Sequence, residues 1–139
     1  MTRPTVPGAA HRGGPMSPER VRELLGKAVD HGQGTHRLED VLQAVARGEM
    51  RLWIAPQAVA VSEFIQFPRR RVLSIAWAGG SFRDMRAVQA GFEAYARGGG
   101  ADAMMMVGRP TRRRARLLGA WARLMGDWTP AGVYLWKDL

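Results

Sequence analysis

The chain has 139 residues, a formal net charge of +9 and a pI of about 11.4, and 46% of its residues are hydrophobic. This length and composition predict one domain that buries a core without cross-links, and the absence of cysteine excludes disulfides, thiolate chemistry and cysteine-based zinc sites. No apolar run approaches the roughly 20 residues of a membrane-spanning helix, and the amino-terminal segment lacks the apolar stretch of a signal peptide, so we expect no membrane span and no secretion.

Residues 1–16 are rich in proline and glycine and contain few apolar anchors, which is typical of a flexible arm. The folded domain is expected to span residues 17–139. Its first helix begins with Ser17 as the N-cap and Pro18 at the first helical position. Apolar residues then recur at helical spacing until Gly32 interrupts them.

A second amphipathic helix is predicted from its N-cap, Thr35, to Gly48. The apolar period then changes to that of β-strands, at residues 51–54, 58–67 and 72–77. Short turn segments separate these runs, which indicates an antiparallel meander. The third run is apolar throughout, as is typical of a central strand that is covered on both faces.

A third helix is predicted to begin at its N-cap, Ser81, with Asp84 in the capping-box position, and to end at the glycines 98–100. Its apolar stripe consists of Phe82, Met85, Val88, Phe92 and Tyr95.

The remaining elements are a short buried strand at 103–107, a fourth helix from Pro110 or Thr111, and a last strand at 133–136. The complete order is ααβββαβαβ. It predicts an α/β (α+β) fold, with a single domain built on a mixed, mostly antiparallel sheet that is flanked by helices.

Two groups of arginines carry most of the net charge. The first group lies in the turn before the third strand (Arg69, Arg70 and Arg71), and the second lies where the fourth helix begins (Arg109, Arg112, Arg113, Arg114 and Arg116). Because the N-terminus of a helix carries a partial positive charge, arginines there are unfavourable unless an anion is close. We therefore treat both groups as candidate binding sites for an anion or an acidic partner. A codon bias that inflates the arginine content is the alternative explanation.

The predicted order resembles the GNAT (Gcn5-related N-acetyltransferase) fold, in which two helices and a meander are followed by a helix, a strand, a helix and a strand. Within that fold, the chain resembles the GNAT-like proteins of tailed phages, which include the family of the T7-type internal virion protein A. The resemblance covers about residues 17–139 and is one of order and pattern. The segments that carry it are Thr35–Val41, Gly48–Trp53, Val72–Ile75 with Gly79 and Gly80, Gly108 with Arg109, and Leu135–Leu139.

The resemblance also directs attention to one loop. Active GNAT enzymes hold the pyrophosphate of acetyl-CoA on the backbone of a Q/R-x-x-G-x-G/A loop between the central strand and the next helix. The corresponding link here is short, and its candidate cofactor-binding residues are Gly79, Gly80 and Ser81. Because so short a link does not enclose a pyrophosphate, we expect no cofactor, with acetyl-CoA binding as the alternative.

The candidate catalytic residues are Glu63, as a general base on a meander strand, and Tyr134, as a general acid. A solvated strand residue and a tyrosine that covers the sheet are the simpler explanations, and we prefer them. The sequence contains no Ser/His/Asp arrangement, no paired carboxylates and no metal-ligand motif.

The expected function is a structural or assembly role in a phage virion, without catalysis. The arm and the arginine groups would dock onto other virion proteins, a second copy of the chain or packaged DNA, and the location would be the virion or the host cytoplasm. One alternative is an acetyl-CoA-dependent N-acetyltransferase with a divergent phosphate loop. The second is a nonspecific nucleic-acid-binding protein.

Overall fold

The computed structural model describes residues 16–106, 128 and 137–139. The chain divides into two compact units, Met1–Met106 and Val107–Leu139. The elements of the first unit are α1 (Pro18–Asp30), α2 (Leu38–Ala46), β1 (Arg51–Ala55), β2 (Ala58–Gln66), β3 (Arg71–Gly80), α3 (Phe82–Ala87), α4 (Gln89–Gly98) and β4 (Ala103–Met106). The predicted fourth helix and last strand, with Tyr134 and the second arginine group, lie outside the described residues.

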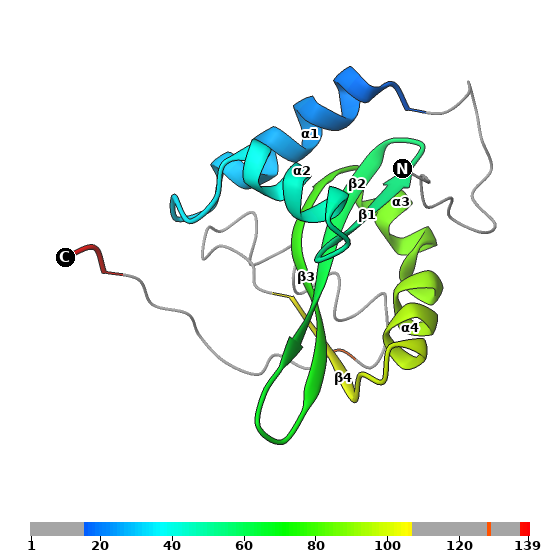
Figure 1. Cartoon of the computed structure of the whole chain (residues 1–139). Helices are drawn as coiled ribbons and strands as arrows, with labels where there is room; N and C mark the ends of the chain where they lie inside the picture. Colours follow the sequence, from blue (N-terminus) through cyan, green and yellow to red (C-terminus); the bar gives the residue numbers. More distant parts are fainter. Residues whose placement is uncertain (1–15, 107–127, 129–136) are drawn as a thin grey trace. The chain divides into compact units, whose positions relative to one another are not determined.

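The four described strands form one mixed sheet in the order β1-β2-β3-β4. The two pairs β1–β2 and β2–β3 are antiparallel, as the meander predicts, and β3–β4 is parallel. A parallel neighbour requires a crossover connection, which α3 and α4 supply (Figure 1). The predicted fold class, with a mixed and mostly antiparallel sheet flanked by helices, is therefore confirmed.

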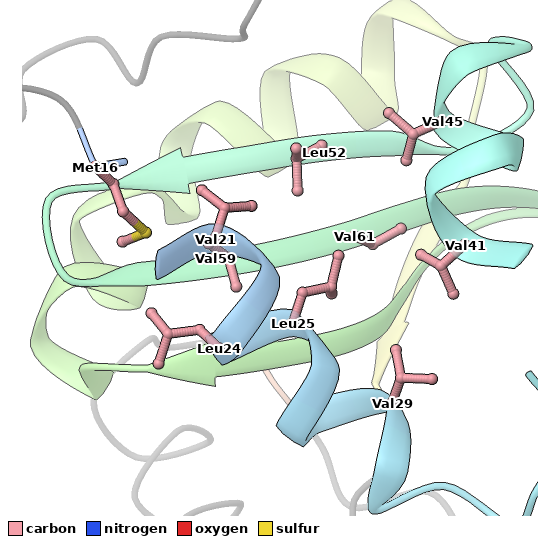
Figure 2. Close-up of a cluster of buried hydrophobic side chains, with 10 residues drawn as sticks. All are labelled: Met16, Val21, Leu24, Leu25, Val29, Val41, Val45, Leu52, Val59 and Val61. Atoms are coloured by element: carbon pink, nitrogen blue, oxygen red, sulfur yellow. The ribbon is translucent and has the colours of Figure 1, made fainter. Parts of the chain in front are cut away.

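Helices cover both faces of this sheet. On one face, α1 and α2 pack on apolar side chains of β1 and β2, as Figure 2 shows. On the opposite face, Trp53 of β1 packs edge-on against Phe92 of α4, with ring centroids 4.9 Å apart. The buried cluster under α1 and α2 consists of Met16, Val21, Leu24, Leu25, Val29, Val41, Val45, Leu52, Val59 and Val61. Met16 belongs to this core, whereas its place next to the proline- and glycine-rich segment predicts that it lies in the arm.

The two amino-terminal helices begin in different ways. In α1, the Ser17 hydroxyl accepts a hydrogen bond from the Arg20 backbone N–H at 3.2 Å, which is the predicted cap. The prediction that Thr35 caps α2 is wrong, because the helix begins at Leu38 and Arg37 is its N-cap residue. There the Asp40 carboxylate accepts from the Arg37 N–H at 2.8 Å, so an acid inside the helix satisfies the preceding backbone.

The segment predicted as one third helix is two helices, α3 and α4, which meet at Val88. The Val88 N–H donates to the Met85 carbonyl at 3.1 Å, three residues back, as in a tight 3₁₀ turn. Val88 itself is fully buried. The apolar stripe therefore continues across the break, which is why periodicity alone does not reveal it.

Strand β3 is longer than the predicted 72–77, because it runs through both glycines to Gly80. Gly80 has φ of 96°, and a Cβ there would collide with the backbone oxygen of Gln57. A Cβ on Gly79 would lie 2.8 Å from the backbone oxygen of Leu24 in α1. Both glycines thus permit close backbone approach within the fold, rather than ending the strand.

Candidate functional site

The second half of β3 has one edge that no described strand covers. The parallel pairing with β4 runs from Val72–Ala103 to Ile75–Met106, and beyond this point the described partners of β3 all belong to β2. The register of β2 on β3 shifts at the same place, because Ser62 pairs with Ile75 whereas Val61 pairs with Trp77. Ala76 is the extra residue of this bulge.

Such a bulge changes what the strand can bind. Bulges bend a strand, increase its twist and re-aim its side chains, and they are frequent beside active sites. The edge from Ala76 to Gly80 carries backbone N–H and C=O groups that can pair with an extended ligand. We take this edge as the centre of the candidate site.

On the α1–α2 side, the edge is flanked by Trp77 and His36. Trp77 packs against the buried cluster under α1 and α2. His36, from the loop between those helices, meets the Trp77 ring edge-on, with centroids 4.8 Å apart. The Nδ1 atom of His36 lies 2.8 Å from the Thr35 hydroxyl. The α1–α2 loop therefore reaches β3 beside the bulge.

Glu63 lies on the same face of the sheet. It follows Val61 by two positions along β2, so its side chain points to the side of α1 and α2. Its cross-strand partner on β3 is the buried Ser74, which in turn pairs with Met105 of β4. Glu63 is half-buried. Of the two candidate catalytic residues, the structure places Glu63 near the bulge, and Tyr134 lies outside the described residues.

The three candidate cofactor-binding residues have partners within the protein. Gly79 and Gly80 pair with Val59 and Ala58 of β2. The Ser81 hydroxyl accepts from the Asp84 N–H at 3.3 Å, which is half of the predicted capping box. The other half is replaced, because the Asp84 carboxylate accepts from the Gln57 N–H at 2.6 Å. Internal packing thus explains all three residues without a ligand.

The first arginine group divides between two environments. Arg69 and Arg70 are exposed in the β2–β3 turn. Arg71 is half-buried, with its guanidinium carbon 4.3 Å from the centroid of the Phe64 ring and its Nε donating to the Gly99 carbonyl at 2.8 Å. Arg71 therefore has a structural role as well.

The sequence does not indicate that Ser74, Trp77 and the bulge at Ala76 lie at the candidate site. The signal for Ser74 is a lone hydroxyl residue in an apolar strand. Trp77 has a weaker signal, a large aromatic residue just before three small ones. The bulge has none, because an inserted alanine does not disturb an apolar run.

No family model matches the chain, and no curated protein matches it. Several solved structures do. The TTHA1254 protein of Thermus thermophilus is 19% identical with a TM-score of 0.59, over 93% of this chain and 98% of that one. An acetyltransferase of Trypanosoma brucei is 14% identical with a TM-score of 0.60, over 87% of this chain and 92% of the other.

An aminoglycoside N-acetyltransferase, AAC(6')-Iy, solved in complex with CoA, is 13% identical with a TM-score of 0.61, over 87% of this chain and 88% of that enzyme. At such low identities these likenesses show the fold. The chain therefore has the fold of the GNAT-type acetyltransferases, as its element order predicts.

The expected virion role is wrong. Three of the similar solved structures are named as acetyltransferases, and nothing in the comparisons supports a phage or internal virion protein. The expectation that no cofactor binds is not supported either, since one similar structure holds CoA. The shared element order does not distinguish a virion protein from an enzyme, because one fold serves both catalytic and non-catalytic proteins. Within the described part of the chain, no helix is long and apolar enough to cross a membrane.

Proposed function

We propose that the protein is an acetyl-CoA-dependent N-acetyltransferase whose cofactor lies along the β3 edge from Ala76 to Gly80. The observation that carries the proposal is the bulge at Ala76, which directly follows Ile75, the last β3 residue paired with the described part of β4. The pantetheine arm of CoA is an extended chain with two amide groups. It can therefore bond to a strand edge as a further strand does. The GNAT-like fold supports the same assignment.

Two arginines of α3 could replace the missing phosphate loop. Arg83 and Arg86 are exposed on the helix that follows the β3 edge, and they lie three residues apart, so they can share one helix face. None of the described ion pairs involves either of them. Two guanidinium groups outside those ion pairs suit the phosphates of a coenzyme.

Glu63 is the residue that we assign to proton transfer. When bound, acetyl-CoA supplies an activated acetyl thioester. The amine nitrogen of the acceptor forms the new C–N bond while the C–S bond breaks, and the nitrogen must lose a proton. The Glu63 carboxylate, on the face that Trp77 shares, is the described acid placed to accept that proton, directly or through a water.

Calorimetry with acetyl-CoA tests the proposal. We expect saturable binding to the wild type and at least a tenfold weaker affinity in the double variant Arg83→Ala/Arg86→Ala. The matched control is Arg20→Ala/Arg22→Ala, which removes the same charge from α1. Undetectable binding to the wild type, or an equal loss in both double variants, would refute the cofactor assignment.

Gly79 and Gly80 are unsuitable for this test, because any side chain there disturbs the packing described above. A thiol-release assay with a panel of primary amines then checks for transfer. CoA should be released only when an acceptor amine is present.

A further inference from the structure

Two serines of the sheet are buried, and they differ in their hydrogen bonds. Ser62 of β2 is 1% exposed and Ser74 of β3 is 6% exposed. The Ser62 hydroxyl accepts from the indole N–H of Trp53 at 2.9 Å. Among the described residues, no side-chain hydrogen bond involves the Ser74 hydroxyl. Ser74 is therefore a buried polar group that calls for an explanation.

The fold alone does not require a hydroxyl at position 74. Ser74 lies in an otherwise apolar run, with Leu73 before it and Ile75 after it. A buried hydroxyl without a partner costs the free energy of the hydrogen bonds that it made to water in the unfolded chain. Alanine at this position avoids that cost. A polar residue that breaks the local pattern in this way is expected where a site needs it.

Glu63 supplies a strong acceptor directly beside Ser74. The two residues are register partners in the antiparallel pair of β2 and β3, so they share a face of the sheet, with their Cβ atoms about 4.5–5.5 Å apart. On the other side, Ser74 pairs with Met105 of β4, whose sulfur is a weak acceptor. The remaining sheet residues around Ser74 on this face have no acceptor in their side chains, and they are Val61, Ile65, Val72 and Trp77.

The Glu63 carboxylate also lacks a described partner. Glu63 is half-buried, and none of the ion pairs or side-chain hydrogen bonds of the described residues involves it. A hydroxyl that donates to a carboxylate forms a short, strong hydrogen bond. Because a glutamate side chain has several staggered rotamers, a change of rotamer brings the carboxylate to the Ser74 hydroxyl without movement of either strand.

We propose that the Ser74 hydroxyl donates a hydrogen bond to the Glu63 carboxylate and thereby positions it for the acceptor amine. This inference rests on the proposed function, in which Glu63 takes the proton of that amine. Ser74 is a positioning residue, because it holds one carboxylate oxygen and leaves the other to accept the proton. Ser74 comes two residues before the bulge at Ala76, so the fixed carboxylate lies beside the start of the proposed cofactor edge.

A double-mutant cycle on acetyl transfer tests the positioning role. We expect Ser74→Ala to lower kcat by at least about tenfold, with an unchanged affinity for acetyl-CoA, and Ser74→Thr to retain most of the rate because it keeps the hydroxyl. In the Glu63→Gln background, Ser74→Ala should cause no further loss, since residues that act as a unit are not additive. The matched control is Ser62→Ala, which removes the other buried hydroxyl and should keep kcat. An unchanged kcat in Ser74→Ala, or the same loss in both backgrounds, would overturn the proposal.

A second cycle, by urea denaturation, requires no activity. In the Glu63→Ala background the Ser74 hydroxyl has no acceptor, so Ser74→Ala should raise the denaturation midpoint. With Glu63 present, the same substitution should lower the midpoint, because it breaks the hydrogen bond. Ser62→Ala should lower it in both backgrounds, because Trp53 loses its acceptor.

The urea cycle also separates this inference from the proposed function. Equal midpoint shifts of Ser74→Ala in the two backgrounds would show that no bond joins Ser74 to Glu63, whether or not the protein transfers acetyl groups. A wild type that transfers none would refute the proposed function and with it the positioning role, while opposite shifts would still establish the bond.

Discussion

At the scale of single residues, the pair Gly79 and Gly80 shows what a sequence can and cannot convey. Two adjacent glycines after an apolar strand indicate a backbone with special freedom, and that inference holds, since Gly80 has φ of 96°. Which atoms lie opposite the glycines depends on tertiary packing. Here these are the backbone oxygens of Gln57 and Leu24, from segments distant in the sequence.

Replacing Gly80 by alanine should therefore destabilise the protein by at least about 2 kcal/mol, because strained backbone and steric overlap both contribute. Urea denaturation measures the change. Gly98→Ala is the control, since Gly98 lies in α4 and a Cβ added there would meet no atom within 4 Å. That variant should be neutral or gain up to about 1 kcal/mol. Equal effects of the two substitutions would contradict this account of Gly80.

Glu63 gives the second prediction at this scale. If its carboxylate takes the proton from the acceptor amine, Glu63→Gln should lower kcat by at least about a hundredfold, in the range of general-base effects, with little change in the affinity for acetyl-CoA. The amide keeps the shape of the side chain but cannot accept the proton. Steady-state kinetics and calorimetry on the same preparation separate the two quantities.

The control for Glu63→Gln is Glu19→Gln in the exposed first turn of α1, which should retain full activity. An unchanged kcat in Glu63→Gln would remove this residue from the mechanism. A joint loss of activity and coenzyme affinity would assign it to binding instead.

At the scale of elements, sequence patterns predicted the helices and strands of the first unit well, and missed the features that arise between elements. The first two helices, the meander and the fourth strand all follow from periodicity. The break at Val88 and the bulge at Ala76 do not, because both preserve the apolar pattern. The predicted cap of α2 is wrong because both Thr35 and Asp40 are good capping residues. In the structure Asp40 accepts from the backbone N–H of Arg37, whereas the Thr35 hydroxyl lies against the ring of His36.

Asp84 connects two elements, and this gives the third prediction. Its carboxylate, in α3, accepts from the Gln57 N–H in the β1–β2 turn. Asp84→Ala should cost about 1.5–3 kcal/mol, as expected for a hydrogen bond to a charged group. Amide exchange at Gln57 should become faster. Asp30→Ala, at the carboxyl end of α1 where a negative charge opposes the helix dipole, should be neutral or slightly stabilising. Unchanged exchange at Gln57 would contradict the link.

At the scale of the whole molecule, the order of elements identified the fold but not the function. The GNAT-like order was recognised from the predicted elements, and the structural comparisons bear it out. The expected virion role is wrong, because a short glycine link between β3 and α3 is not evidence against a coenzyme. A strand edge can hold an extended ligand without that loop, and the edge depends on a bulge that the sequence does not reveal.

The topology also predicts an order of stability. Connections of a few residues join β1 to β2 and β2 to β3, whereas β4 reaches β3 only after α3 and α4. Contacts that are local in sequence form early, and non-local ones form late. Native-state hydrogen exchange should therefore be slowest in the paired parts of β2 and β3, and faster in Met104–Met106. Equal protection in β4 would show that the sheet opens as one unit.

The part of the β3 edge that no described strand covers has a consequence for how the protein behaves at high concentration. Unpaired strand edges promote intermolecular pairing and aggregation. The stretch from Ala76 to Gly80 bears no charged side chain that would discourage such pairing, although its bulge and its two glycines twist and weaken it as a template. Any ligand that occupies this edge would then act as a solubility factor, keeping the chains apart during expression and storage.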